Sequence, residues 1–359
     1  MAPPWIHSRS KSEIVDMQSE VIDMSMVNAA ARGSLIIDAL QYNKPERARF
    51  EEWRAGGVGC IHVTVAIWES ARETLSALGE WNRLLERNAD LIGLATSADD
   101  IERIAASGRT AIVYGFQDTS PFEDDIELVE IFYQLGVRIA QLTYNVQNRV
   151  ASGCWEPDEN GVSKFFGRNV IAEMNRLGML VDVSHCTERT CFDAIEYSSR
   201  PIAITHANPQ EFVGTDIELN RRNKSTALMR RLAERGGVIG LSMYPKIMKD
   251  GSNCSLETFL DMIAWTVDLI GVDNVGFGTD YYDGWPESEI MWWRAGRWSR
   301  ESAVPIKGFS EWPSWFKSPA DFPGILDGLE RRGFQLEDIR KIAGGNWLRL
   351  FRESFVPQP

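Results

Sequence analysis

The stretches Leu180-Val181-Asp182-Val183-Ser184-His185 and Ile202-Ala203-Ile204-Thr205-His206-Ala207-Asn208-Pro209 decide the fold. Each is a short apolar run, rich in β-branched residues, that stops at polar residues, which is typical of a buried strand. The segment between them, residues 188–197, has a helical pattern. Together they predict a strand, helix, strand unit in which both strands end in a histidine.

The two histidines are expected to be neighbours. Parallel strands joined by a helix have their carboxyl ends on one side of the sheet, where α/β folds place their chemistry. The chain has only four histidines, and two of them, His185 and His206, fall at equivalent strand ends. A single buried histidine is more often a hydrogen-bonded core residue, but two converging neutral imidazoles are a common base for a zinc-type site. The pair therefore predicts metal binding.

The same rhythm of strands and helices continues along the chain. We expect eight strands, at residues 35–40, 60–67, 110–114, 138–142, 180–183, 202–205, 237–241 and 274–278. Several follow a glycine that ends a helix, as at Gly178 and Gly271. Eight β/α units over about 250 residues match a TIM (β/α)8 barrel. The alternative, an open doubly wound sheet, would carry a glycine-rich phosphate turn after an early strand, and none is evident.

The barrel is expected to form one domain, residues 34–359, preceded by a helical lead-in over residues 1–33. In the lead-in, Met17, Val21, Met24 and Val27 have near-helical spacing. Residues 284–320 hold six of the thirteen tryptophans. In a barrel this tryptophan-rich loop would hang over the mouth, as a lid or subunit contact or in direct contact with substrate.

Composition excludes several classes of function. The net charge of −13 leaves no basic excess to neutralise phosphates, so a nucleic-acid partner is not expected. The five cysteines are scattered, with no C-x-x-C pair, which suits free thiols in a reducing compartment. The N-terminal residues show no apolar signal-peptide core, and no run is long enough to cross a bilayer. We therefore predict a cytoplasmic protein with no membrane partner.

Several spaced motifs resemble one known family. They run in order from about Leu35 to Phe351 and comprise residues 181–185, 203–208, Arg222-Asn223, 236–240, 276–280 and 344–347. This pattern resembles the membrane (renal) dipeptidase family, peptidase family M19. The resemblance implies a TIM barrel of the amidohydrolase type that cleaves dipeptides or related amides with two zinc ions bridged by a glutamate and a hydroxide.

The resemblance also implies roles for individual residues. His185 and His206 would hold one metal, and Asp280 would lie beside the bridging water as ligand and proton acceptor. Arg222 would bind the carboxylate of the substrate, which suits the planar fork of guanidinium donors.

Four positions depart from the family pattern. Leu40 and Tyr42 replace the His-x-Asp ligands that follow the first strand, Gln117 replaces the bridging glutamate, and Tyr144 replaces a histidine. Leucine cannot ligate, tyrosine is a poor zinc ligand near neutral pH, and glutamine brings no charge to hold two dications together.

The three family positions that this sequence retains, His185, His206 and Asp280, would suffice for a single tetrahedral metal with an open water position. His62, on the second strand, is a candidate third nitrogen. Alternation along the strand points either His62 or its neighbours inward, and a buried structural histidine is the other interpretation.

Our leading hypothesis is a metal-dependent hydrolase with one Zn²⁺ per chain, acting on an amide or peptide-like bond of a small molecule. Asp280 would accept a proton, Tyr144 would donate a hydrogen bond to the oxyanion, and Arg222 would hold a carboxylate. Further candidates for substrate binding are Tyr42, Gln117 and Asn208.

Two other functions remain open. One is a lyase, decarboxylase or isomerase that uses Tyr42, Tyr144 and Asp280 as acid and base groups. The other is a catalytically inactive homologue that binds a ligand through its tryptophan-rich loop. An acidic surface and an aromatic-rich loop also suit a homodimer.

Overall fold

The structure is a computed structural model of the whole chain, and it describes residues 33–158, 160–214, 220–296, 299–300 and 310–358. The expected helical lead-in, residues 1–33, lies outside the described residues apart from Gly33.

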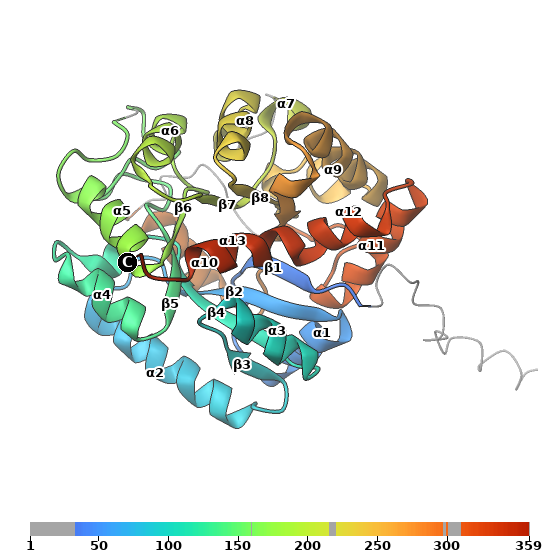
Figure 1. The fold of residues 1–359 in the computed structure, drawn as a ribbon, viewed down its shortest axis with the longest axis horizontal. Helices are drawn as coiled ribbons and strands as arrows, with labels where there is room; N and C mark the ends of the chain where they lie inside the picture. The colour runs from blue at the N-terminus through green and yellow to red at the C-terminus, as the bar shows by residue number, and fades with distance from the viewer. Residues whose placement is uncertain (1–32, 159, 215–219, 297–298, 301–309, 359) are drawn as a thin grey trace, which may run out of the picture.

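The described residues form a closed parallel β-barrel (Figure 1). The sheet runs in the order β2-β1-β9-β8-β7-β6-β5-β4, and pairing of β2 with β4 closes it. The strands are β1 Ile36–Gln41, β2 Val58–Ala66, β3 Ile92–Leu94, β4 Thr110–Phe116, β5 Val137–Gln141, β6 Leu180–Asp182, β7 Ala203–Ala207, β8 Val238–Leu241 and β9 Val275–Phe277. All eight expected strands are present, so the predicted TIM barrel is confirmed. The additional strand β3 pairs with the start of β4, and its three residues were too few to give a sequence pattern.

Helices alternate with these strands and cover the outside of the barrel (Figure 1). They are α1 Arg47–Ala55, α2 Ala71–Arg87, α3 Ala98–Ala106, α4 Glu127–Gln134, α5 Phe166–Leu177, α6 Glu188–Tyr197, α7 Gln210–Val213, α8 Thr226–Glu234, α9 Leu256–Ile270, α10 Glu287–Ala295, α11 Phe322–Arg331, α12 Leu336–Arg340 and α13 Asn346–Ser354. Side-chain caps fix several starts: Thr187 accepts from Thr190 N before α6, and Ser225 accepts from Leu228 N before α8. The strand, helix, strand unit β6-α6-β7 is therefore as predicted.

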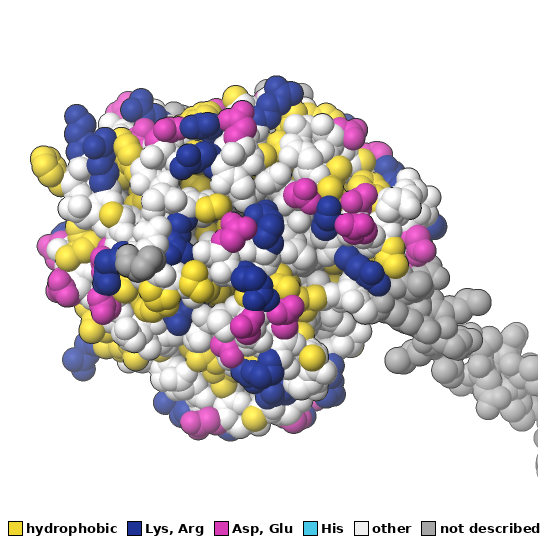
Figure 2. All heavy atoms as spheres, viewed as in Figure 1, with side chains coloured by type: hydrophobic (Ala, Val, Ile, Leu, Met, Phe, Trp, Pro, Cys, Tyr) yellow, Lys and Arg dark blue, Asp and Glu magenta, His cyan; other side chains and the backbone are white. Residues whose placement is uncertain are grey.

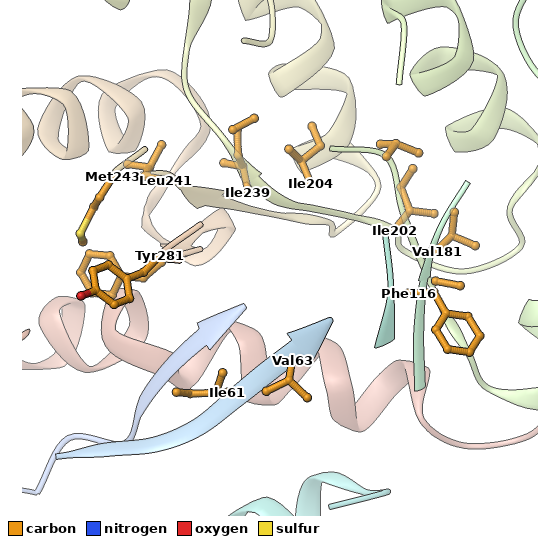
Figure 3. Close-up of a cluster of buried hydrophobic side chains, with 14 of the residues drawn as sticks. Ile61, Val63, Phe116, Val181, Ile202, Ile204, Ile239, Leu241, Met243 and Tyr281 are labelled. Carbon is orange, nitrogen blue, oxygen red and sulfur yellow. The ribbon is translucent and has the colours of Figure 1, made fainter. Parts of the chain in front are cut away.

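Alternation along β2 separates two apolar layers. Ile61 and Val63 point to the outer layer between strands and helices, which Figure 3 shows together with Ile204 and Ile239. Cys60 belongs to a second cluster, which includes Ile37 and Val113 of the neighbouring strands and Trp347 of α13. Because the strands are buried on both faces, their sequences are nearly continuous apolar runs.

The amino-terminal end of the barrel is closed by α13 (Figure 1). Trp347 is fully buried there, and its indole Nε1 donates to Phe277 O at 3.0 Å. A Cβ at Gly276 would lie 2.3 Å from Trp347 Nε1, so this glycine is required by close packing. The motif at residues 344–347 thus belongs to the barrel floor, away from the mouth.

The five cysteines are all free, as the sequence predicted, and the structure shows that all five are buried. Among the residues that the structure describes, no helix has the length and apolar character needed to cross a bilayer. Lys and Arg side chains are interspersed with Asp and Glu over the face that carries α13 (Figure 2).

Candidate active site

A pocket of about 650 Å³, including its opening to solvent, lies at the carboxyl ends of the strands. This is the face where TIM-barrel enzymes carry their active sites. Its lining comes from strand ends, from the loops that follow them and from α10: Tyr42, Gln117, Tyr144, Asn145, Trp155, His185, Arg222, Tyr244, Asp280, Tyr282, Ile290, Trp293 and Arg294.

His185 and His206 meet beside this pocket. Their Nε2 atoms lie 3.0 Å apart, and both side chains are almost completely buried. The structure therefore brings together the two histidines that the sequence predicted to be neighbours.

Asp182, the last residue of β6, fixes the relative position of the two histidines. One carboxylate oxygen accepts from Ser184 N at 3.0 Å and from Thr205 N at 3.0 Å, and the two hydroxyls of Ser184 and Thr205 donate to the carboxylate at 2.6 Å each. These bonds join the segments that precede His185 and His206. Asp182 is therefore a positioning residue, which the sequence showed only as one polar residue in an apolar strand.

Both imidazoles are held through Nδ1. His185 Nδ1 lies 2.6 Å from Asn145 Oδ1, and His206 Nδ1 lies 2.8 Å from Thr205 Oγ1. The Thr205 hydroxyl proton is already donated to Asp182, so this oxygen accepts from His206 Nδ1–H. With Asn145 Oδ1 also accepting, both Nε2 atoms carry lone pairs that face each other. This hydrogen-bond pattern, with Nδ1–H fixed by an oxygen, is the one that prepares histidine for metal binding through Nε2.

The surroundings keep both rings neutral. Burial, followed by the positive charge of Arg222, lowers the pKa of His185 and of His206 well below the usual value. Two neutral Nε2 atoms at this separation can share one cation.

Asp280 lies at the end of β9 in a left-handed backbone conformation, with φ 58°. Its N–H donates to Leu40 O at 3.1 Å, and one carboxylate oxygen lies 4.0 Å from Arg222 Nη2. Burial raises the pKa of Asp280 to about 7, Arg222 opposes this rise, and the Asp38 carboxylate adds to it. Non-glycine residues rarely adopt a positive φ, and those that do are often found at functional sites.

Arg222 links the two halves of the site. Its Nη1 donates to Ser184 O at 2.6 Å and its Nη2 to His206 O at 3.2 Å, so the guanidinium is anchored on the segments that carry the histidines. Since a guanidinium has five N–H donors, further donors are available to a ligand in the pocket. The placement fits the expected role in carboxylate binding.

The expected three-residue metal site is not assembled. In the described parts of the chain, no group of three or more His, Cys, Asp and Glu side chains could hold a metal ion. His185 and His206 are paired, whereas the Asp280 carboxylate faces Arg222. Of the three expected ligands, the structure therefore brings the two imidazoles into contact.

The second metal of the family does not fit these residues. Leu40 is a fully buried apolar side chain, and the Tyr42 ring packs against Trp293 with centroids 4.5 Å apart. Gln117 lines the pocket, and its Nε2 donates to Thr64 Oγ1 at 2.8 Å. Its buried Oε1 has no hydrogen-bond partner among the residues that the structure describes. A neutral amide oxygen cannot supply the charge that a bridging carboxylate gives to two dications.

His62 points into the barrel, below the pocket. Strand alternation alone had left open whether His62 or its neighbours point inward. Its Nδ1 lies 2.6 Å from Ala39 O, and a Cβ at Gly115 would lie 2.0 Å from its Nε2. Burial lowers the pKa of His62 to about 4. It is a neutral interior histidine and does not line the pocket.

Asn208 is a structural residue, which corrects its assignment to substrate binding. Its side-chain amide donates to Ser242 O at 3.0 Å and Ile247 O at 3.1 Å, and its Oδ1 accepts from Ser242 N at 2.9 Å. The side chain is fully buried, and all its bonds fasten the loop after β8.

The sequence did not single out seven of the thirteen lining residues as site residues. Asn145 and Tyr244 each follow closely after a strand, so their position was a usable signal. Trp293 and Arg294 lie in the tryptophan-rich loop that was expected over the mouth, and α10 places both on the pocket. Trp312 and Trp315, from the same loop, pack against the main core. Only tertiary structure separates these two groups.

The family model described as membrane dipeptidase, peptidase family M19, matches residues 10–290. Dipeptidase tcpJ of Claviceps purpurea is 28% identical over 79% of this chain, and an uncharacterized dipeptidase of Schizosaccharomyces pombe is 32% identical over 79%. The chain spans 60% and 62% of the lengths of these two relatives.

A solved structure gives a closer overall match. An amidohydrolase from Pseudomonas aeruginosa superposes with a TM-score of 0.85 and 33% identity, covering 90% of this chain and 97% of that one. The family match over most of the chain and this structural similarity agree with the barrel fold. This chain belongs to the membrane dipeptidase family, peptidase family M19.

Proposed function

We propose that the protein is a hydrolase that cleaves an amide or peptide-like bond in a small molecule bearing a carboxylate. One observation carries this proposal: the paired Nε2 atoms of His185 and His206 lie at the mouth of a barrel of the dipeptidase family, with Asp280 and Arg222 on the same pocket.

We propose one divalent ion per chain, zinc, held by His185 and His206. When bound, such an ion lowers the pKa of a water molecule and polarises a carbonyl. The family's two-ion arrangement is not proposed, because Leu40, Tyr42 and Gln117 supply no ligands for it.

Asp280 is the proton acceptor in this proposal. Its carboxylate lines the pocket and is 20% exposed, so a substrate-side water can reach it. Arg222 lies 4.0 Å away and favours the ionised form, which is the form that accepts a proton.

Tyr144 is the proposed hydrogen-bond donor to the oxyanion. Its ring stacks on His185, and Asp118 fixes its backbone, because Tyr144 N donates to Asp118 Oδ2 at 2.8 Å. Burial raises the pKa of Tyr144, so the hydroxyl keeps its proton at neutral pH. A fixed, protonated hydroxyl suits a role as donor to developing negative charge.

A second candidate is a lyase, decarboxylase or isomerase that uses Asp280 and Tyr144 for proton transfer. The observation that favours it is that the described residues place only two of the expected metal ligands together. An inactive ligand-binding homologue is the third candidate.

The test is a product analysis by mass spectrometry with a panel of dipeptides and N-acyl amino acids, with metal content measured on the same sample. Hydrolysis gives two products whose masses sum to the substrate plus one water. A lyase or decarboxylase gives products whose masses sum to that of the substrate alone, and an isomerase gives one product of unchanged mass. His185→Ala should lose both metal and activity, and activity retained in metal-free His185→Ala would contradict the proposal.

We further propose that the protein works in the cytoplasm as a homodimer. The five free, buried thiols suit a reducing compartment. Cell fractionation and light scattering of the purified chain test the two statements separately.

A further inference from the structure

Aromatic side chains make up much of the pocket lining. Six of its thirteen lining residues are Tyr or Trp: Tyr42, Tyr144, Trp155, Tyr244, Tyr282 and Trp293. The proposed function uses only Tyr144. The remaining rings come from the loops that follow β1, β5, β8 and β9 and from α10, so separate elements contribute to this lining.

Four of these rings form a continuous wall. Tyr244 and Tyr282 have centroids 6.0 Å apart with planes at 67°, and Tyr282 and Trp293 have centroids 6.3 Å apart at 84°. Trp293 and Tyr42 follow at 4.5 Å and 39°. The planes of Tyr282 and Trp293 are nearly perpendicular, so these two rings present their faces in different directions. Trp293 is 7% exposed, and the other three rings of the wall are half-buried.

Charges of both signs accompany this wall. The carboxylates of Glu69 and Glu289, after burial itself, raise the pKa of Tyr42, so negative charge lies near that ring. Asp280 adds a carboxylate to the pocket lining, and Arg222 and Arg294 add cations. The site therefore suits a ligand that carries both a cation and a carboxylate.

We propose that the wall formed by Tyr42, Tyr282 and Trp293 binds an N-alkylated ammonium group, with a trimethylammonium as the best-fitting form, while Arg222 and Arg294 take the carboxylate of the same molecule. The inference rests on the proposed function, which supplies the reaction; what it adds is how the same site binds its substrate. Aromatic faces attract cations through the ring quadrupole, and aromatic cages are a known mode of quaternary ammonium recognition. N-methyl groups also fill an apolar cage without needing hydrogen-bond acceptors. The N–H groups of a primary ammonium would need such acceptors.

Three matched probes separate the contributions. Trimethylammonioacetate carries the cation and the carboxylate, 3,3-dimethylbutanoate has the same shape without the positive charge, and glycine has the charge without the methyl groups. Isothermal titration calorimetry with the purified full chain should show trimethylammonioacetate binding about tenfold or more tightly than either of the other two.

Paired variants locate the binding site. Tyr282→Leu should weaken trimethylammonioacetate binding about tenfold, while Tyr282→Phe, which keeps the ring, should bind as the unaltered protein does. Trp293→Leu should act like Tyr282→Leu. Trp292→Leu is the matched control, because Trp292 belongs to the same helix and aromatic cluster but does not line the pocket. Circular dichroism verifies that each variant is folded.

The outcomes are distinct from those of the hydrolysis test. Equal affinity for trimethylammonioacetate and 3,3-dimethylbutanoate, tighter binding of glycine, or binding of none of the probes would overturn the inference. Because binding is measured without turnover, a failed cage would leave amide hydrolysis standing. A confirmed cage in a chain that cleaves no amide would instead refute the proposed function.

Discussion

The ring of Tyr144 stacks on the imidazole of His185, with centroids 4.1 Å apart and planes inclined by 26°. One residue thus both supports the histidine pair and presents a hydroxyl at the pocket. The two contributions can be separated, because phenylalanine keeps the ring and removes only the hydroxyl.

Tyr144→Phe should lower kcat on the order of 100-fold, because the oxyanion loses a donor, and should leave the melting temperature nearly unchanged. Tyr144→Leu should lower both. Steady-state kinetics and calorimetric melting measure these effects. An unchanged kcat in Tyr144→Phe would show that the hydroxyl takes no part in the reaction.

Metal content should be at most one equivalent per chain. His185→Ala and His206→Ala should each remove it, since each leaves a single imidazole. His62→Gln serves as the control, because His62 lies below the pocket and should not alter metal content in folded protein. Elemental analysis after exhaustive dialysis makes the measurement, and two equivalents would contradict the ligand argument.

Activity should rise with pH. Asp280 accepts a proton only when ionised, and its pKa is raised to about 7, so kcat/KM should increase as pH passes through that value. Arg222 lowers the pKa of Asp280, so Arg222→Met should move this rise to higher pH. A profile that stays flat from pH 5 to 9 would remove Asp280 from the proton-accepting role.

The free energy of unfolding should fall as pH rises, whereas activity should increase. Burial raises the pKa of Asp38 and of Asp118 to about 6, above the ordinary value of 3.8, so the folded state holds protons that the unfolded state releases. Their contribution is fully present below the unfolded pKa and is lost as pH rises through about 6. Each group accounts for on the order of 3 kcal/mol.

Urea unfolding between pH 4 and pH 7 measures this dependence. Asp38→Asn should flatten the slope, because asparagine does not titrate. The same slope in that variant would assign the pH dependence to other groups.

Asn208→Ala should destabilise the protein by about 1–3 kcal/mol and leave KM unchanged, because buried hydrogen bonds to Ser242 and Ile247 are lost while the pocket lining is kept. Urea unfolding and steady-state kinetics test the two halves. A raised KM with unchanged stability would restore Asn208 to substrate binding.

The sequence alone determined the barrel and the two histidines at neighbouring strand ends. These features depend on local patterns, since apolar runs, helix stops and strand order are encoded by residues close together in the chain. The sequence also showed that Leu40, Tyr42, Gln117 and Tyr144 depart from the family pattern, because only the identity of each residue is needed to see this.

Only tertiary structure decided which side chains share the pocket. The inward direction of His62, the burial of Asn208 and the turn of Asp280 towards Arg222 depend on contacts between distant segments. The aromatic wall joins Tyr42 to Trp293, residues that are far apart in the chain. Such pairings arise when the barrel closes, because closure brings every strand end to one rim whatever its position in the sequence.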